Sequence, residues 1–353
     1  MVSVEFTATK ELVEAFKQAA AVAPKKAPHK GILECVMLTV SSETVTLEAT
    51  DLQTYYRRTV MADSIDAPIP LSAAIHRSAA KALKPGTRVT LTERSYTVGP
   101  VTSPSDDPLA FPNFPRVYDG KEVTVDPTYF AALASCAAFA SNSEVRPALK
   151  GVCHRGRTLV ATDGVCLLQA DAGGEFGQAV NLPADAVAIL KRVFGKTGAV
   201  LVYDTDHALF QQADTRVVVR LQDGTYPDVS HLFKDGQKVK FYIHDTKPWL
   251  AALDDVITMH KLAGTPNDRH IVRLRQEGHT VTLSAHGAGS SFSATLEVGG
   301  PVGDWEYQTN AANLRKALAH AVGSVTVCAG APNQPLLLES ESRKALVSAV
   351  LTY

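Results

Sequence analysis

The chain has 353 residues, and its 35 basic and 36 acidic side chains leave a formal net charge of −1. This near neutrality excludes a chain that attracts nucleic acid over its whole surface, and no run of 18 or more apolar residues predicts a membrane-spanning helix. Hydrophobic residues make up 45% of the sequence, so a chain of this length is expected to form two or three domains with separate cores.

The first third of the chain opens with the alternating segment VEFTAT, which predicts a short strand. Residues 10–23 follow with apolar side chains at helical spacing, and Thr9 stands where a helix N-cap is expected. A second helix is predicted over residues 71–84, because a Pro-Gly pair that would end it follows directly. The rest of this third is predicted to form short strands separated by turns rich in Gly, Asp, Pro and Ser.

The other two thirds repeat this order of elements. In the middle third, the strand-like segment VTVD leads to a predicted helix over residues 127–140, with Asp126 as the N-cap, and a second helix is predicted over residues 183–196. In the last third, helices are predicted over residues 247–260, with Thr246 as the N-cap, and over residues 309–322. The chain is therefore predicted to contain three copies of one unit with two helices each.

A short motif at the end of a strand supports the threefold repeat. It reads TLEATDLQ, LVATDGVC and VTLSAHGAG, and its alanines, Ala49, Ala161 and Ala285, lie 112 and 124 residues apart. Spacings of domain size predict three domains, each with two helices on one face of antiparallel sheets. This arrangement is an α+β fold.

Proline next to an aromatic residue marks two predicted joints between domains. Phe111-Pro-Asn-Phe-Pro ends the first third, Tyr226-Pro-Asp ends the second, and a polar segment follows each. Proline fixes its own backbone and restricts the residue before it, so these segments suit short connections between rigid modules. We therefore predict domains over residues 1–120, 121–238 and 239–353.

The sequence gives no support for catalysis, a cofactor or a metal site. Asp51 and Asp163 occupy equivalent positions in different repeats, about a domain apart, which favours a role in turns over shared acid–base chemistry. A phosphate-binding loop and a nucleophile elbow are absent, and HGAGSS (286–291) lacks the glycine spacing of a dinucleotide site. Five scattered cysteines and a first segment unlike a signal peptide favour a reducing compartment. We predict a cytoplasmic protein that is not an enzyme.

Three longer segments carry a resemblance to a known family. VRPALKGVCHRGRTLVATDGVCLLQA (145–170) contains the corner motif, RLQDGTYPDVSHLF (220–233) follows it, and GILECVMLTVSSETVTLEATDLQ (31–53) contains its first copy. With the joint at Phe111-Pro-Asn, they resemble the bacterial DNA polymerase III β subunit, the sliding clamp. Each motif is short, but their order and spacing extend the resemblance over the whole chain.

This resemblance implies three DNA-clamp domains in each chain and a homodimer that closes into a ring, with helices around a hole for double-stranded DNA. It implies a processivity factor that tethers a DNA polymerase and has no catalytic site of its own. The implied partners are double-stranded DNA, bound without sequence preference, the DNA polymerase, the clamp loader and other proteins with clamp-binding motifs. A divergent mobile-element or phage paralogue, serving a dedicated polymerase or repair enzyme, is an alternative.

The resemblance also implies a cleft between the second and third domains that binds short peptide motifs of partner proteins. The matching residues are Leu149, Thr162, Gly164, Val165, Cys166, Leu167, Pro227, His231, Leu232, Val347, Ser348, Ala349, Val350 and Leu351. An alternative is that the apolar members are ordinary core residues. The chain departs from the family at Val165-Cys166, where the family has His-Arg, and at its last residues, so a cleft of different shape is expected.

Basic residues predict the surface that faces DNA. The six predicted helices contain eleven basic and five acidic residues, so a shared helix face would be positive, with an ordinary solvated face as the alternative. The resemblance assigns DNA contact to Lys25, Lys26, Lys30, Arg146, Lys191, Arg192, Arg315 and Lys316. It assigns the dimer interface to Tyr96, Val98, Ile257 and Met259.

Overall fold

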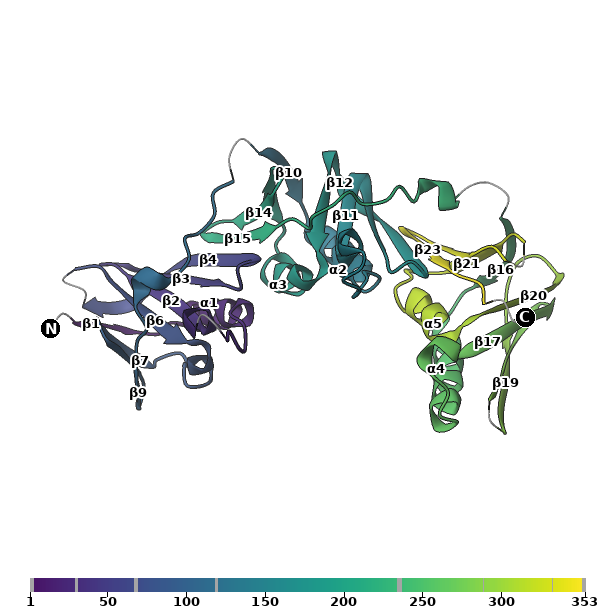
Figure 1. Cartoon of the computed structure of the whole chain (residues 1–353), viewed down its shortest axis with the longest axis horizontal. Helices are drawn as coiled ribbons and strands as arrows, with labels where there is room; N and C mark the ends of the chain where they lie inside the picture. Colours follow the sequence, from purple (N-terminus) through teal and green to yellow (C-terminus); the bar gives the residue numbers. More distant parts are fainter. Residues whose placement is uncertain are drawn as a thin grey trace. The chain divides into compact units, whose positions relative to one another are not determined.

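The computed structural model describes residues 3–28, 31–66, 69–117, 120–233, 237–287, 289–331 and 333–350 (Figure 1). Over these ranges the chain forms five α-helices and 23 β-strands, linked by turns and short 3₁₀ helices. The α+β class predicted from the sequence is therefore confirmed.

Packing divides the chain into two compact units. The first contains Met1–Ala134 and Gly173–Gln222, and the second contains Ser135–Ala172 and Asp223–Tyr353. The first and last thirds of the chain each lie within one unit, whereas the middle third is shared between the two. Domain boundaries near residues 120 and 238 therefore stay a prediction.

Two antiparallel sheets form the first unit. The smaller sheet contains β1 (Ser3–Thr7), β5 (Asp63–Asp66), β7 (Arg88–Thr92), β8 (Ser95–Val98) and β9 (Val101–Pro104). The larger sheet contains β2 (Cys35–Val40), β3 (Thr44–Thr50), β4 (Thr54–Met61), β6 (Leu71–His76), β10 (Lys121–Val125), β13 (Ala199–Tyr203), β14 (His207–Gln212) and β15 (Thr215–Arg220). Their strand orders are β5-β1-β7-β8-β9 and β10-β13-β14-β15-β4-β3-β2-β6.

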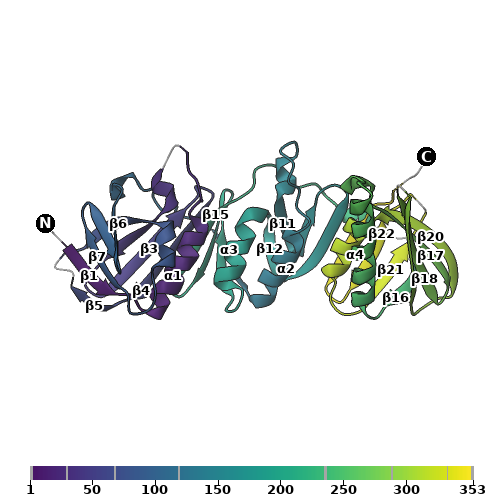
Figure 2. The same cartoon turned by 90° about the horizontal axis from the view of Figure 1, so that it is seen from below.

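Helix α1 (Lys10–Val22) covers part of the larger sheet of the first unit, against β3 and β4 (Figure 2). Thr9 caps it as predicted, because the Thr9 hydroxyl accepts a hydrogen bond from the Leu12 N–H at 3.1 Å. On β4, the buried Tyr56 donates a hydrogen bond to Gln18 of α1 at 2.9 Å. The face of β4 that carries Tyr56 is therefore the face that the helix covers.

Helices α2 (Pro127–Ala137) and α3 (Ala184–Phe194) confirm the two helices predicted for the middle third. Asp126 caps α2 as predicted, since its carboxylate accepts hydrogen bonds from two N–H groups of the first turn, at 2.8 and 3.1 Å. Phe130 of α2 packs on Phe194 of α3 with the ring centroids 5.9 Å apart. Aromatic packing thus joins these two helices in the first unit.

Two further antiparallel sheets form the second unit. One contains β11 (Gly151–Thr162), β12 (Cys166–Pro183), β16 (Lys238–Ile243), β21 (Val325–Ala329), β22 (Leu336–Ser340) and β23 (Arg343–Val347). The other contains β17 (Ile271–Gly278), β18 (Thr280–Gly287), β19 (Ser290–Glu297) and β20 (Gly303–Asn310). Their strand orders are β11-β12-β23-β22-β21-β16 and β19-β18-β17-β20.

Helices α4 (Thr246–Leu262) and α5 (Ala311–Ala319) confirm the two helices predicted for the last third, and they pack side by side in the second unit (Figure 1). The predicted N-cap Thr246 is wrong by one residue. Asp245 caps α4 instead, because its carboxylate accepts a hydrogen bond from the Lys247 N–H at 2.9 Å.

The helix predicted over residues 71–84 is wrong. Its first half is the strand β6, which pairs with β2 in the register Val36↔Ile75 and Leu38↔Ala73. Only Arg77–Lys81 forms a helical turn, and this turn is a 3₁₀ helix. The edge position beside β2 buries Ala73 and Ile75, and this burial outweighs the helix propensity of an alanine-rich segment.

The same kind of strand pairing joins consecutive thirds of the chain twice. In the first unit, β4 of the first third pairs with β15, the last strand of the second third, with Tyr55 opposite Val218. In the second unit, β12 of the second third pairs with β23, the last strand of the last third, with Leu167 opposite Leu346. Each junction is therefore a continuous antiparallel sheet.

Candidate functional site

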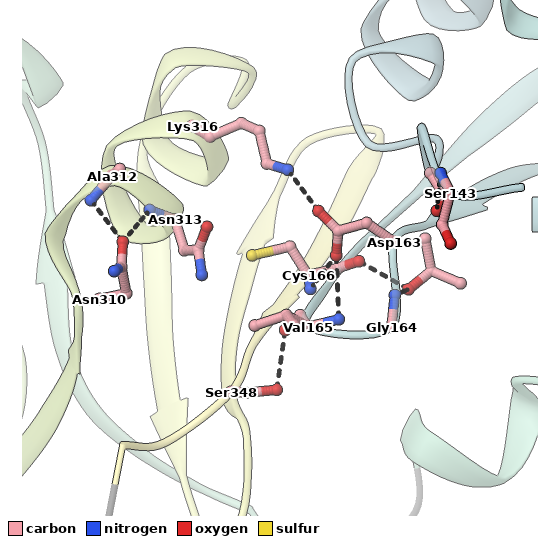
Figure 3. Close-up of polar contacts among 12 residues, drawn as sticks. Ser143, Asp163, Gly164, Val165, Cys166, Asn310, Ala312, Asn313, Lys316 and Ser348 are labelled. Carbon is pink, nitrogen blue, oxygen red and sulfur yellow. Dashed lines mark hydrogen bonds and ion pairs between the residues drawn. The ribbon is translucent and has the colours of Figure 1, made fainter. Parts of the chain in front are cut away.

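The corner between β11 and β12 is fixed by hydrogen bonds to its own backbone (Figure 3). One carboxylate oxygen of Asp163 accepts from the N–H groups of Val165 and Cys166 at 2.9 and 2.7 Å. The Thr162 hydroxyl donates to the Cys166 carbonyl at 2.6 Å. Gly164 has a φ of +93°, which a residue with a side chain adopts only with strain. This turn role confirms the interpretation of Asp163 from the sequence.

Asp51 makes the same turn in the first third. Its carboxylate accepts hydrogen bonds from the N–H groups of Gln53 and Thr54 at 3.0 and 2.6 Å. The two aspartates therefore hold equivalent corners at two junctions, as the repeat predicts.

The second of these two corners also forms an ion pair with another element. The ammonium of Lys316 on α5 lies 2.9 Å from the free carboxylate oxygen of Asp163 and 4.7 Å from the centre of the Phe139 ring (Figure 3). Burial raises the pKa of Asp163, but the hydrogen bonds from Cys166, Lys316 and Val165 outweigh it and leave this pKa below its ordinary value. The corner therefore carries a half-buried anion that is paired with a lysine from the last third.

An apolar cluster lies beside this corner in the second unit. Its buried members are Leu149, Cys153, Val160, Leu167, Tyr226, Cys328, Leu337 and Leu346, and Val229 and Phe233 pack against them. The Tyr226 hydroxyl accepts a hydrogen bond from the Thr162 N–H at 2.9 Å, which ties the segment after β15 to the corner. Side chains from the second and last thirds of the chain thus form one apolar cluster, which is the floor of the predicted cleft.

The residues predicted for the cleft separate into a buried floor and an exposed rim. Leu149, Thr162, Cys166, Leu167 and Val347 are buried. Val165 and Leu232 are 50% and 39% exposed, Pro227 and His231 are exposed, Ser348, Ala349 and Val350 are half-buried, and Gly164 forms the corner. Leu351 lies outside the described residues.

A groove of about 670 Å³ includes His231 and Leu232 in its lining, together with Gln237, Gln334 and Pro335. Its lining combines apolar and amide side chains with Lys238 and Lys240, and such a mixture suits a short extended peptide. The two predicted rim residues His231 and Leu232 therefore border a measurable groove.

The segment after β23 connects the corner to the second sheet of the unit. The Ser348 N–H and hydroxyl donate to the Val165 carbonyl at 3.1 and 2.7 Å. The Thr309 hydroxyl donates to the Ser348 carbonyl at 2.8 Å, and the Val350 N–H donates to the Gln308 carbonyl at 3.0 Å. The final described residues are therefore held on both sides.

Several cleft residues were missed by sequence reasoning: Cys153, Val160, Tyr226, Cys328, Leu337 and Leu346. Tyr226 was assigned to a domain joint, although its large ring next to a proline is also a signal for an anchored corner. Leu337 and Leu346 are paired across β22 and β23. They reach the cleft only because these strands pair, and the sequence of a single strand does not indicate its partner.

The predicted DNA-facing residues have different surroundings. Lys25, Lys26, Arg146, Lys191 and Arg192 are exposed. Arg315 donates two hydrogen bonds to Asp254, one of them 3.0 Å long, and Lys316 pairs with Asp163. Lys30 lies outside the described residues. The exposed residues are free to meet a polyanion, whereas two of the helix cations already have acidic partners.

The predicted dimer residues Tyr96 and Val98 are buried side chains of β8. Because β8 pairs with β7 on one side and β9 on the other, β8 is an inner strand, and the two edges of this sheet are β5 and β9. Ile257 and Met259 are half-buried on α4. Tyr96 and Val98 therefore lie one strand inside the β9 edge, and the dimer interface stays a prediction.

Among the residues that the structure describes, no three His, Cys, Asp or Glu side chains gather into a metal-binding group. In the same ranges, no helix is long and apolar enough to cross a membrane. The Cys166 thiol, next to the corner, has its pKa raised to about 12 by burial, so it is a protonated and unreactive group at neutral pH.

Comparison with solved structures gives matches to bacterial sliding clamps over the full chain. The DNA polymerase sliding clamp from Bacillus subtilis has a TM-score of 0.87 at 17% identity, covering 100% of both chains. The β subunit from the DNA polymerase of Streptococcus pyogenes has a TM-score of 0.88 at 19% identity, covering 99% of this chain and 100% of that one. The sliding clamp from Pseudomonas aeruginosa bound to griselimycin has a TM-score of 0.85 at 18% identity, covering 99% and 100%.

No protein-family model matches the sequence, and no curated protein sequence matches it. The chain therefore has the fold of the bacterial sliding clamps at low sequence identity. The resemblance found in the sequence motifs is confirmed at the level of the fold.

Proposed function

We propose that this protein is a DNA sliding clamp, a homodimeric ring that encircles double-stranded DNA and tethers a DNA polymerase for processive synthesis. The fold match over the whole chain supports this proposal. The clamp function needs position and topology only, so it is consistent with a chain whose motifs predict no catalytic site. The comparisons do not favour the alternative of a dedicated mobile-element or phage paralogue.

The observation that carries the proposal is the repeated strand pairing at the two junctions. The strand after the corner of one third pairs with the last strand of the next third, as β4 with β15 and β12 with β23. One strand of each kind has no such partner within the chain. These are β19, which follows the corner of the last third, and β9, which is the last strand of the first third. Both stand at the free edges of their sheets.

A second copy of the chain supplies the missing partner for each of these edges. If β19 of one chain pairs with β9 of the next, the junction that occurs twice within the chain also occurs between chains. This contact is head-to-tail, and it closes into a ring when the rotation between copies allows it. Closure also removes two free sheet edges, which otherwise invite aggregation.

The exposed basic residues supply the contact with DNA in this proposal. Lys25 and Lys26 follow α1, and Lys191 and Arg192 lie in the last turn of α3. Cations on or next to helices attract phosphates without reading bases, so binding is independent of sequence and weakens as salt rises. The groove beside His231 and Leu232 then receives short linear motifs of the polymerase, the clamp loader and other partners.

Cysteine cross-linking tests the head-to-tail contact. Thr102 on β9 and Ser293 on β19 are exposed, and the five native cysteines are buried. A chain carrying Thr102→Cys mixed with a chain carrying Ser293→Cys is expected to give a covalent dimer with a flexible bismaleimide. Each variant alone is expected to stay monomeric on a denaturing gel.

The matched control places the second cysteine at Asp304, an exposed residue on β20 at the opposite edge of the same sheet. Equal cross-linking of Thr102→Cys with Asp304→Cys and with Ser293→Cys would contradict the proposed pairing. Cross-linking of Ser293→Cys with itself would indicate a symmetric contact, which does not build this ring.

A further inference from the structure

The first junction contains a groove that the sliding-clamp function does not use. It measures about 920 Å³ and is lined by Arg57, Arg116 and Arg216 together with Phe114 and Leu209. Tyr56 of β4 faces helix α1, so the next residue along the strand, Arg57, faces the opposite side of the sheet. The groove is therefore on the sheet face turned away from α1, and away from the proposed DNA surface.

The groove occupies the same place in the repeat as the floor of the peptide cleft. Tyr55 pairs with Val218 at the first junction, and Leu167 pairs with Leu346 at the second. Leu209, which lines the groove, is opposite Val218, just as Leu337 of the cleft floor is opposite Leu346. The first junction thus has a counterpart of the second junction's cleft.

The charges at these equivalent positions differ. Arg57 stands directly opposite Arg216 at the first junction, whereas the corresponding pair at the second is Gln169 and Lys344. Lys344 is neutralised by Glu339, 2.7 Å away.

At the first junction Arg216 lacks such an acid, because the residue opposite it on β14 is Gln211, and the acid Glu48 lies opposite Arg57 instead. Like charges directly opposite each other destabilise a sheet. The groove therefore holds positive charge at a cost to the fold.

Other contacts hold the arginines in place without closing the groove. The Arg57 guanidinium lies 4.2 Å above the centre of the Phe114 ring and 2.6 Å from a carboxylate oxygen of Glu48. Among the described residues, Arg116 and Arg216 make no ion pair or side-chain hydrogen bond. One guanidinium is thus fixed and two exposed guanidinium groups remain available to a ligand.

We propose that this groove is a second docking site, which binds an extended acidic peptide segment of a partner protein. Carboxylates accept two parallel hydrogen bonds from a planar guanidinium, and Leu209 offers an apolar contact between the charged positions. Single-stranded nucleic acid fits less well. Its sites depend on free aromatic faces, and Arg57 covers a face of Phe114 while Tyr55 meets this ring at 76°.

Fluorescence anisotropy with the purified chain tests this site. The probe is a fluorescein-labelled peptide, Glu-Asp-Leu-Glu-Phe-Asp-Gly, and its control carries Gln and Asn in place of the acids. The acidic probe is expected to bind, and Arg216→Gln is expected to weaken it roughly tenfold, because one charge-assisted contact is lost. The matched control is Lys344→Gln at the equivalent position of the second junction, which is expected to leave the affinity unchanged.

Three results would overturn the proposal: equal binding of the amide probe, equal effects of Arg216→Gln and Lys344→Gln, or displacement of the peptide by a short oligothymidine at lower concentration. Circular dichroism of both variants checks that they remain folded. The measurement uses no DNA and no polymerase, so its outcome is independent of the proposed clamp function.

Discussion

The ion pair between Asp163 and Lys316 distinguishes two corners that are otherwise built alike. Both corner aspartates accept two backbone hydrogen bonds, and Asp163 also binds the lysine of α5. Its side chain is only 29% exposed, so the carboxylate is partly shielded from water. This contact fastens the corner of the proposed partner cleft to the last third of the chain.

Replacing Asp163 by Asn should therefore cost more than replacing Asp51 by Asn. The amide oxygen keeps the turn hydrogen bonds in both variants, but only Asp163→Asn leaves a lysine without its counter-charge. We expect a loss of about 1 to 3 kcal/mol in the free energy of unfolding for Asp163→Asn, measured by urea denaturation. Equal losses in the two variants would show that the ion pair contributes nothing.

The pH dependence of the free energy of unfolding tests the role of Asp163 in a second way. The pKa of Asp163 in the folded protein lies below its ordinary value of 3.8. This carboxylate therefore stabilises the native state fully above that value, and its contribution is lost as the pH falls through the lower folded pKa. The stability of Asp163→Asn is expected to depend less on pH in this acidic range than that of the unaltered chain.

Sequence reasoning succeeded for residues whose role is local. The turn aspartates, the N-cap Thr9 and the N-cap Asp126 act on backbone groups two or three residues away, so a short motif predicts them. The partnership of Lys316 was not predicted, because its carboxylate lies 153 residues earlier in the chain. Lys316 was instead assigned to DNA contact from the family resemblance and its positive charge.

At the scale of elements, strand pairing explains where the structure differs from the sequence-based prediction. Five of the six predicted α-helices form, but the segment 71–84 contributes the strand β6 because β2 needs a neighbour. The predicted list of cleft residues was incomplete for the same reason. Leu337 and Leu346 reach it through strand pairing, and the repeat predicts copies of a unit but not which copies share a sheet.

The pairing of Arg57 with Arg216 predicts a gain in stability from removing one charge. Arg216→Gln should raise the free energy of unfolding by about 0.2 to 1 kcal/mol, because like charges opposite each other are unfavourable. Lys344→Gln should give no gain, since this lysine has Glu339 as a partner. Thermal denaturation of both variants measures the difference, and a destabilised Arg216→Gln would contradict the repulsion.

At the scale of the whole molecule, basic side chains near the helices account for DNA binding. Neutralising Lys25, Lys26 and Lys30 with Gln should weaken retention on duplex DNA without altering folding. The slope of log affinity against log salt should become shallower by roughly 1 for each lysine that contacts a phosphate. Lys344→Gln is the control, because it removes a lysine that is not assigned to DNA contact. Unchanged binding at low salt in the triple variant would count against this surface.

A topological link to DNA tests the clamp function most directly. A chain carrying both Thr102→Cys and Ser293→Cys is mixed with circular duplex DNA, cross-linked, and washed at high salt, which removes electrostatic binding. We predict that the cross-linked ring stays on the circular plasmid and is released when a restriction enzyme cuts the plasmid once. Loss from the closed circle in the high-salt wash, or retention after the cut, would contradict the proposal that this protein encircles DNA.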